Sequence, residues 1–203
     1  MYKFRFFFFL LFLLLSYISF SQNDKVFIKP EKVLYKSTKQ GDLNLYFYRP
    51  LDFDKSKTYN CIIFFHGGGW NSGDYKQFER QSMYFASRGM IAISAEYRIK
   101  NKHGTTPIQA MEDAKSAIRF LRLNAKSFFI NPNRIAAAGG SAGGHLAAVT
   151  ANIDLFDNVN EDLGISSKPN LLVLYNPVID FGSRKWLWID NPSDASPVHN
   201  ISK

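Results

Sequence analysis

The stretch Arg134-Ile-Ala-Ala-Ala-Gly-Gly-Ser-Ala-Gly-Gly-His-Leu-Ala-Ala-Val-Thr150 decides the fold of this 203-residue chain. It begins as a short apolar run, turns at its central Gly-Ser-Ala and continues as an Ala-rich helical pattern. Ser141 is the centre of a G-x-S-x-G motif, which belongs on a sharp turn between a strand and a helix. We expect a strained backbone there that projects the Ser141 hydroxyl from the sheet edge. Gly139 and Gly143 suit such a turn, because strand and helix pass close together around it.

A second glycine-rich motif, His66-Gly-Gly-Gly-Trp70, directly follows another short apolar run. Three glycines in a row are costly in backbone entropy and therefore need a reason. Without side chains, the N–H groups of Gly68 and Gly69 can approach a substrate oxygen and stabilise the oxyanion of acyl transfer. The N–H of Ala142, the residue after the serine, would be a third donor. Alone, this loop is also typical of a phosphate-binding or simple turn, but the serine motif downstream favours an oxyanion hole.

The chain outside these motifs alternates between strand patterns and helix patterns. Two strands around a Gly-Asp turn predict an antiparallel hairpin at a sheet edge, and three short apolar runs predict buried strands. The five predicted strands are Lys32–Lys36, Leu43–Tyr48, Cys61–Phe65, Met90–Ala95 and Leu171–Tyr175, in addition to the apolar run before Ser141. This order predicts one α/β domain over residues 22–203, with a mainly parallel sheet, an N-terminal antiparallel hairpin and helices on both faces.

Two helices are predicted between the strands. The first spans about Tyr75 to Arg88. The second begins with a capping box, in which Thr106 caps the helix, Pro107 takes its first position and Gln109 completes the box. Its apolar stripe is Met111, Ala114, Ala117, Ile118 and Leu121, with Lys115, Arg119 and Arg122 expected outside. We expect residues 96–105 to form a loop, Asn131-Pro-Asn133 a turn, and residues 152–170 and 176–203 irregular segments.

The first 21 residues have the pattern of a secretory signal peptide. Basic Lys3 and Arg5 precede an unbroken apolar run from Phe6 to Leu15, and Ser19-Phe-Ser21 follows. This order predicts cleavage near residues 21–22 and a secreted or periplasmic protein without a stable membrane anchor. An uncleaved anchor is the alternative, although this apolar core is short for spanning a bilayer.

Charge and composition exclude several classes of function. The net charge is +8, but the basic residues are scattered and do not alternate with aromatic residues, so we expect no nucleic-acid partner. The lone cysteine, Cys61, lies in an apolar run and is predicted to be a core residue. No His/Asp/Glu cluster has metal-ligand spacing, so neither a metal nor a cofactor is expected.

With both motifs in place, the chain resembles the α/β-hydrolase superfamily, in particular the esterase/lipase group similar to hormone-sensitive lipase and the related carbohydrate esterases. The matching segments are His66–Trp70, Glu96-Tyr-Arg98, Glu112–Arg119 and Gly139–Gly144. The resemblance implies that Ser141 is the nucleophile and that Gly68, Gly69 and Ala142 line the oxyanion hole. It implies further that His66 shapes the loop with Gly67 and is not the base. The signal peptide and the Gly-Gly-Ser-Ala-Gly-Gly form look most like secreted acetyl-xylan and feruloyl esterases, so the implied substrate is an acylated carbohydrate or another small ester.

The general base and its acid are harder to find. In this superfamily the order along the chain is serine, acid, histidine, and only His145 and His199 follow Ser141. His145 lies one helical turn from the serine, where a packed, hydrogen-bonded role is expected. His199 is a candidate base and Asp180 a candidate acid, although a turn residue is the more expected role for Asp180. The resemblance instead places both groups after further strands, so we expect them beyond residue 203. The chain would then be a truncated hydrolase with an open apolar sheet edge and feeble activity.

Three functions are therefore compared. The leading hypothesis is a serine carboxylic-ester hydrolase; an amide hydrolase or peptidase of the same fold is the enzymatic alternative. A non-catalytic ligand-binding remnant is the alternative from another class. Trp186 and Trp188 are predicted either to form a platform for an acyl group or sugar, or simply to pack.

Overall fold

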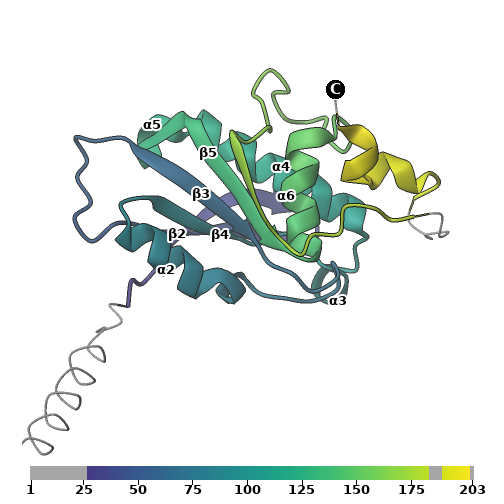
Figure 1. Cartoon of the computed structure of the whole chain (residues 1–203), viewed down its shortest axis with the longest axis horizontal. Coiled ribbons are helices and arrows are strands. Elements are labelled where there is room, and N and C mark those ends of the chain that lie inside the picture. The colour runs from purple at the N-terminus through teal and green to yellow at the C-terminus, as the bar shows by residue number, and fades with distance from the viewer. Residues whose placement is uncertain (1–26, 183–188, 202–203) are drawn as a thin grey trace, which may run out of the picture.

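A computed structural model describes residues 27–182 and 189–201. Its described part is built around a six-stranded sheet (Figure 1). The strands are β1 (Glu31–Thr38), β2 (Gly41–Tyr48), β3 (Tyr59–Phe65), β4 (Ile91–Ala95), β5 (Ile130–Gly140) and β6 (Leu171–Tyr175). The predicted signal peptide, Trp186 and Trp188 lie outside the described residues. None of the helices in the described part combines the length and hydropathy required of a membrane span.

The strand order is β1-β2-β4-β3-β5-β6. Strands β1 and β2 form an antiparallel hairpin, and β2 pairs with β4 antiparallel. Strands β4, β3, β5 and β6 are parallel to one another. This is the predicted mainly parallel sheet with an antiparallel hairpin at one edge. Within the described residues β6 lies at the other edge, where Leu171 is 61% exposed.

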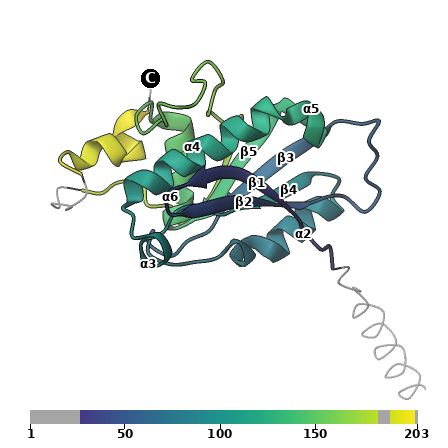
Figure 2. The ribbon, with the colours of Figure 1, turned by 180° about the vertical axis from the view of Figure 1, so that it is seen from behind.

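Helices cover both faces of the sheet. The 3₁₀ turn η1 (Tyr75–Phe78) leads into α2 (Glu79–Ser87), and these pack on the face that carries Ile62 and Phe64. Helices α4 (Pro107–Leu123) and α6 (Ala142–Asn152) pack on the face that carries Ile63 and Phe65. In both Figure 1 and the view from behind in Figure 2, α2 runs below the sheet and α4 above it. The remaining short helices are α3 (Lys100–His103), α5 (Ala125–Phe128), η2 (Pro192–Ala195) and η3 (Pro197–Asn200).

Helix α4 begins as the sequence predicts but buries more of its surface. The capping box between Thr106 and Gln109 is present, and all five residues of the apolar stripe are buried. The prediction that Lys115 and Arg119 lie outside is wrong, because their side chains are only 2% and 8% exposed. The cause is residues 153–170, which follow α6 and fold over these cations.

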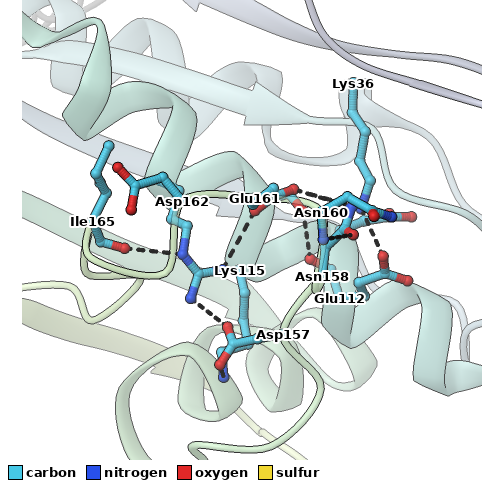
Figure 3. Close-up of polar contacts among 12 residues, drawn as sticks. Lys36, Glu112, Lys115, Asp157, Asn158, Asn160, Glu161, Asp162 and Ile165 are labelled. Carbon is cyan, nitrogen blue, oxygen red and sulfur yellow. Dashed lines mark hydrogen bonds and ion pairs between the residues drawn. The ribbon is translucent and has the colours of Figure 1, made fainter.

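Hydrogen bonds and ion pairs tie that loop to α4 (Figure 3). The Lys115 ammonium donates to the carbonyl oxygens of Ile153 (2.8 Å) and Leu155 (2.7 Å) and pairs with Asp157 at 2.9 Å. Arg119 also pairs with Asp157 and donates to the carbonyl oxygen of Ile165 (2.9 Å). The charges are thus buried without being left unpaired, which is the condition for tolerating them in a core.

A second buried pair fastens the segment after β4. The carboxylate of Asp113, fully buried in α4, accepts from the backbone N–H of Arg98 (3.0 Å) and from its guanidinium (2.7 and 2.8 Å). Lys36 of β1 pairs with the same carboxylate at 2.9 Å. One buried carboxylate therefore joins the edge strand, α4 and the segment that follows β4.

Two other local expectations need correction. The expected turn at residues 131–133 lies within the bounds of β5, where the pairing shifts register between Tyr59 and Cys61 of β3. Tyr59 pairs with Ile130 and Cys61 with Ile135, so four residues of β5 (131–134) lie opposite a single residue of β3. These four residues form a bulge and do not end the strand. The expected loop 96–105 contains the short helix α3, which ends at Gly104 with φ 66°.

Candidate active site

The serine turn joins β5 directly to α6. Ser141 has φ 53° and ψ −117°, a conformation that an L-residue adopts only under strain. Its N–H donates to the carbonyl oxygen of Tyr175 at the end of β6 (3.0 Å). Its own carbonyl oxygen accepts from the N–H groups of His145 (3.0 Å) and Val178 (3.3 Å). Backbone bonds to the helix and to the chain after the neighbouring strand thus hold the strained residue in place.

Close contact explains the glycines on both sides of the serine. A Cβ added to Gly143 would lie 2.0 Å from the carbonyl oxygen of Phe65, and one added to Gly139 would lie 2.3 Å from the carbonyl oxygen of Gly143. Any side chain at either position would therefore push α6 away from β3 and β5. This is the close approach that the sequence motif predicts.

The triple-glycine loop lies beside the serine. It leaves the end of β3, which pairs in parallel with β5 so that Phe65 is opposite Gly139. A Cβ added to Gly67 would lie 3.0 Å from the carbonyl oxygen of Gly140 and 3.6 Å from the Cβ of Ser141. The two motifs therefore meet at one edge of the sheet.

The loop exposes backbone donors at this meeting point. Gly68 and Gly69 have φ values of 120° and 60°, which favour glycine. Within the described part of the chain, no backbone acceptor takes the N–H of either glycine. Ala142 is the first residue of α6, so its N–H has no partner within the helix. The arrangement offers three backbone donors near the serine.

His66 is buried under the loop that it begins. Its Nδ1 donates to the carbonyl oxygen of Gly67 at 2.8 Å, and its ring stacks on Tyr97 with centroids 4.2 Å apart. The Tyr97 hydroxyl donates to the backbone carbonyl of His66 (2.7 Å). Burial lowers the pKa of His66, which keeps the ring neutral. The ring supports the loop from behind.

The structure adds a residue that the motifs do not reveal. Gln77, in η1, accepts the N–H of Gly67 with its side-chain oxygen. Gln77 and Ser141 lie at similar distances from Gly67. A Cβ added to Gly67 would be 3.4 Å from the Gln77 side-chain oxygen and 3.6 Å from the Ser141 Cβ. Phe78 and Tyr175 lie beside the turn next to Gly140, with ring centroids 5.9 Å apart. No spacing rule links Gln77 to the glycines, so only the fold identifies it.

The candidate base and acid are brought together, at the surface. His199 Nε2 lies 3.3 Å from Asp180 Oδ1, and the two side chains are 50% and 47% exposed. Backbone N–H donation from Gly182 is the main reason why the pKa of Asp180 is lowered. None of the hydrogen bonds found in the described ranges joins a histidine side chain to Ser141.

His145 is fully buried in α6. Its Nε2 donates to the carbonyl oxygen of Ala195 at 2.8 Å, and burial lowers its pKa to about 4. The imidazole is packed and hydrogen-bonded, as the sequence predicts, and burial keeps it neutral.

Comparisons with known proteins show the family to which the chain is similar. A family model described as BD-FAE matches residues 45–188. The chain is 33% identical over 148 residues to arylacetamide deacetylase of Bos taurus, covering 70% of this chain and 36% of that protein. It is 28% identical over 135 residues to an acetylxylan esterase of Xylanibacter ruminicola, covering 64% of this chain and 25% of that protein.

A solved structure gives the same result for the fold. Esterase 2 of Thermogutta terrifontis, phosphorylated by paraoxon, superposes with a TM-score of 0.81 at 42% identity, covering 85% of this chain and 66% of that one. The matched part of the chain thus spans 36% and 25% of the two curated relatives and 66% of this esterase.

Proposed function

The chain belongs to the BD-FAE family, in the esterase/lipase group of α/β-hydrolases, and we propose that it is a serine-dependent carboxylic-ester hydrolase. The observation that carries the proposal is the strained turn of Ser141, set against a glycine loop whose Gly68 and Gly69 N–H groups have no backbone acceptor among the described residues. A strained nucleophile beside fixed donors is the arrangement that acyl transfer requires.

The reaction would proceed in two halves. The Ser141 oxygen attacks the ester carbonyl carbon and gives its proton to a general base, while the N–H groups of Gly68, Gly69 and Ala142 hold the oxyanion. The C–O bond to the alcohol then breaks, and the alcohol leaves with that proton. Water attacks the acyl-serine, which releases the acid and restores the hydroxyl of Ser141.

The substrate we favour is a short acyl group on a carbohydrate or another small alcohol. Two of the relatives are named for removing acetyl groups, one from an arylacetamide and one from xylan. Phe78 and Tyr175 stand close to the turn, since a Cβ on Gly140 would lie 3.3 Å and 3.9 Å from their nearest side-chain atoms. Such aromatic walls leave little room for a long acyl chain on that side of the serine.

Covalent labelling tests the nucleophile. Paraoxon should add a diethylphosphoryl group to the peptide that contains Ser141, detected by mass spectrometry, and Ser141→Ala should abolish the adduct. Ser87→Ala is the control, because Ser87 is an exposed residue of α2 whose hydroxyl donates to a carbonyl oxygen of its own helix. Labelling at another serine, or none in the wild-type chain, would refute the proposed mechanism.

An ester panel tests the substrate. We expect p-nitrophenyl acetate to be cleaved faster than p-nitrophenyl octanoate, and acetylated xylan to release acetate. Faster cleavage of p-nitroacetanilide than of the acetate ester would favour the amide hydrolase. Binding of xylan without labelling or turnover would favour the non-catalytic remnant.

The positions of the base and acid beyond residue 203 remain a prediction. The Asp180–His199 pair is half exposed, and none of the hydrogen bonds in the described ranges joins either side chain to Ser141. We therefore assign it no catalytic role.

We propose export as well, on the sequence of residues 1–21 alone. Expressed with its own first 21 residues in a Gram-negative host, the protein should be recovered from the periplasm with an N-terminus near Gln22. A full-length N-terminus in the cytoplasmic fraction would refute this.

A further inference from the structure

Trp70 has a strained backbone directly after the triple-glycine loop. Its φ is 59°, a conformation that is unfavourable for a bulky L-residue. The strain persists only where the surroundings fix the residue. Here Trp70 and Asn71 accept, through their carbonyl oxygens, the N–H groups of Lys100 (2.9 Å) and Asn101 (3.0 Å). These bonds to α3 hold the backbone of Trp70 in place while its indole is buried against the nucleophile helix.

The indole contacts His145. The two rings are perpendicular, with centroids 5.1 Å apart, and Phe181 packs against both at 5.5 Å and 5.0 Å. His145 lies one turn from the nucleophile in α6, and its backbone N–H donates to the carbonyl oxygen of Ser141. Trp70 and His145 therefore form a contact between the triple-glycine loop and α6, the helix that begins after the nucleophile.

Each ring has one buried nitrogen without a hydrogen-bond partner among the described residues, and the two nitrogens are complementary: one is a donor and the other an acceptor. Within the described ranges, neither Trp70 Nε1 nor His145 Nδ1 makes a hydrogen bond. A carbonyl oxygen only accepts, so the bond to Ala195 requires the proton of His145 to be on Nε2. Nδ1 then holds a free lone pair, while the indole Nε1–H is a free donor. Leaving both buried groups unsatisfied costs free energy, which favours joining them.

We propose that the Trp70 indole and the His145 imidazole are positioning residues, linked by one buried water molecule that accepts from Nε1–H and donates to Nδ1. The expected consequence of the link is that it holds the oxyanion donors at a fixed distance from Ser141, and this consequence rests on the proposed function. The imidazole also reaches Ala195, so one neutral side chain connects the glycine loop, α6 and η2. Burial keeps its pKa at about 4, which preserves the accepting lone pair at neutral pH.

Variant kinetics test the consequence. Trp70→Phe keeps a ring and removes the donor; His145→Phe removes the acceptor. Each should lower the rate of paraoxon labelling of Ser141 and the kcat for p-nitrophenyl acetate by about 10- to 100-fold with KM nearly unchanged, as expected for misplaced catalytic donors. The double variant should lose no more than the worse single variant, because residues joined in one link are not additive. His145→Gln, which keeps an acceptor, should recover part of the rate.

The control separates positioning from stability. Leu121→Val in the core of α4 should lower the Tm and leave the labelling rate unchanged, since Leu121 is buried in a helix that carries neither motif. If the losses in the Trp70 and His145 variants are additive, or if Leu121→Val loses as much labelling rate for the same fall in Tm, the link is refuted.

A spectroscopic reading tests the link without activity. In ¹⁵N-labelled protein, the indole N–H resonance of Trp70 is identified by its loss in Trp70→Phe. It should exchange slowly with solvent and shift in His145→Phe, and His145 should show the Nε2–H tautomer. An indole signal that does not respond to His145→Phe would overturn the link. Absence of paraoxon labelling in the wild-type chain would instead overturn the proposed function and leave this spectroscopic test standing.

Discussion

Mild acid should destabilise this protein through the imidazole of His145. In an unfolded chain its pKa is near 6.5, whereas burial lowers the pKa in the folded protein to about 4. Between these values the unfolded state binds a proton that the folded state does not, so stability falls as the pH falls. The stability that the protein gains from keeping this imidazole uncharged is fully present above pH 6.5 and is lost progressively toward pH 4. At about 1.36 kcal/mol for each pKa unit, the loss amounts to about 3 kcal/mol, a large share of the about 5–15 kcal/mol that stabilises an ordinary domain.

Urea unfolding between about pH 7.5 and pH 4 measures this contribution. His145→Gln is the reference, because it removes the titrating group and keeps a side-chain amide. Other groups with lowered pKa values, such as His66 and His103, titrate in both proteins and cancel in the difference. The stability advantage of the wild-type protein over the variant should shrink by about 3 kcal/mol as the pH falls through this window. Parallel curves for the two proteins would show that His145 is protonated as readily in the folded state as in the unfolded state.

Three further outcomes are expected. Gly143→Ala should prevent folding or abolish paraoxon labelling, because its Cβ would lie 2.0 Å from a backbone oxygen, whereas Gly89→Ala has open space and should cost only about 1–2 kcal/mol for its positive φ; equal effects of the two would contradict the packing argument. Asp113→Ala should lower the free energy of unfolding by about 3–5 kcal/mol, since it removes the fully buried carboxylate and leaves Lys36 and Arg98 only their pairs with the less buried Glu112. Asp154→Ala, which breaks an exposed pair, should cost no more than about 1 kcal/mol, and urea titrations that fail to separate these two variants would disprove the buried network. His199→Ala should leave the labelling rate of Ser141 unchanged; a marked loss would identify His199 as the base.

The sequence predicts those features of the fold that depend on short-range sterics. The capping box at Thr106 and the apolar stripe of α4 follow from residues within a few turns of each other. The strained φ of Ser141 follows from the motif, because a turn that tight between a strand and a helix leaves few backbone conformations. In each case the residues that decide the structure are neighbours along the chain.

Features that depend on distant segments could not be predicted in this way. Lys115 and Arg119 have the spacing of a solvated helix face, and only the fold of residues 153–170 over α4 makes them buried. Gln77 has no motif, and its bond to Gly67 exists because η1 returns to the edge of the sheet. Asp113 lies beside Glu112 and both carboxylates pair with Arg98 and Lys36, yet only Asp113 is fully buried, which the sequence does not reveal.

The convergence of the two glycine motifs could be predicted only in part from the sequence. Each motif directly follows a parallel strand, so both must leave the same edge of the sheet, and the sequence alone requires that much. It does not require β3 and β5 to be neighbours, because β4 lies between them along the chain. The sheet order supplies this condition, since β3 pairs with β5 on one side and with β4 on the other.

The proposed chemistry depends on the pairing of these two strands. Had β4 been inserted between β3 and β5, two strand spacings of about 4.8 Å each would separate the glycine loop from the serine turn. The donors of Gly68 and Gly69 could not then reach an oxygen bound to the carbon that Ser141 attacks. Direct pairing of β3 with β5 instead places Phe65 opposite Gly139, so that the loop and the turn begin one residue and two residues later on adjacent strands.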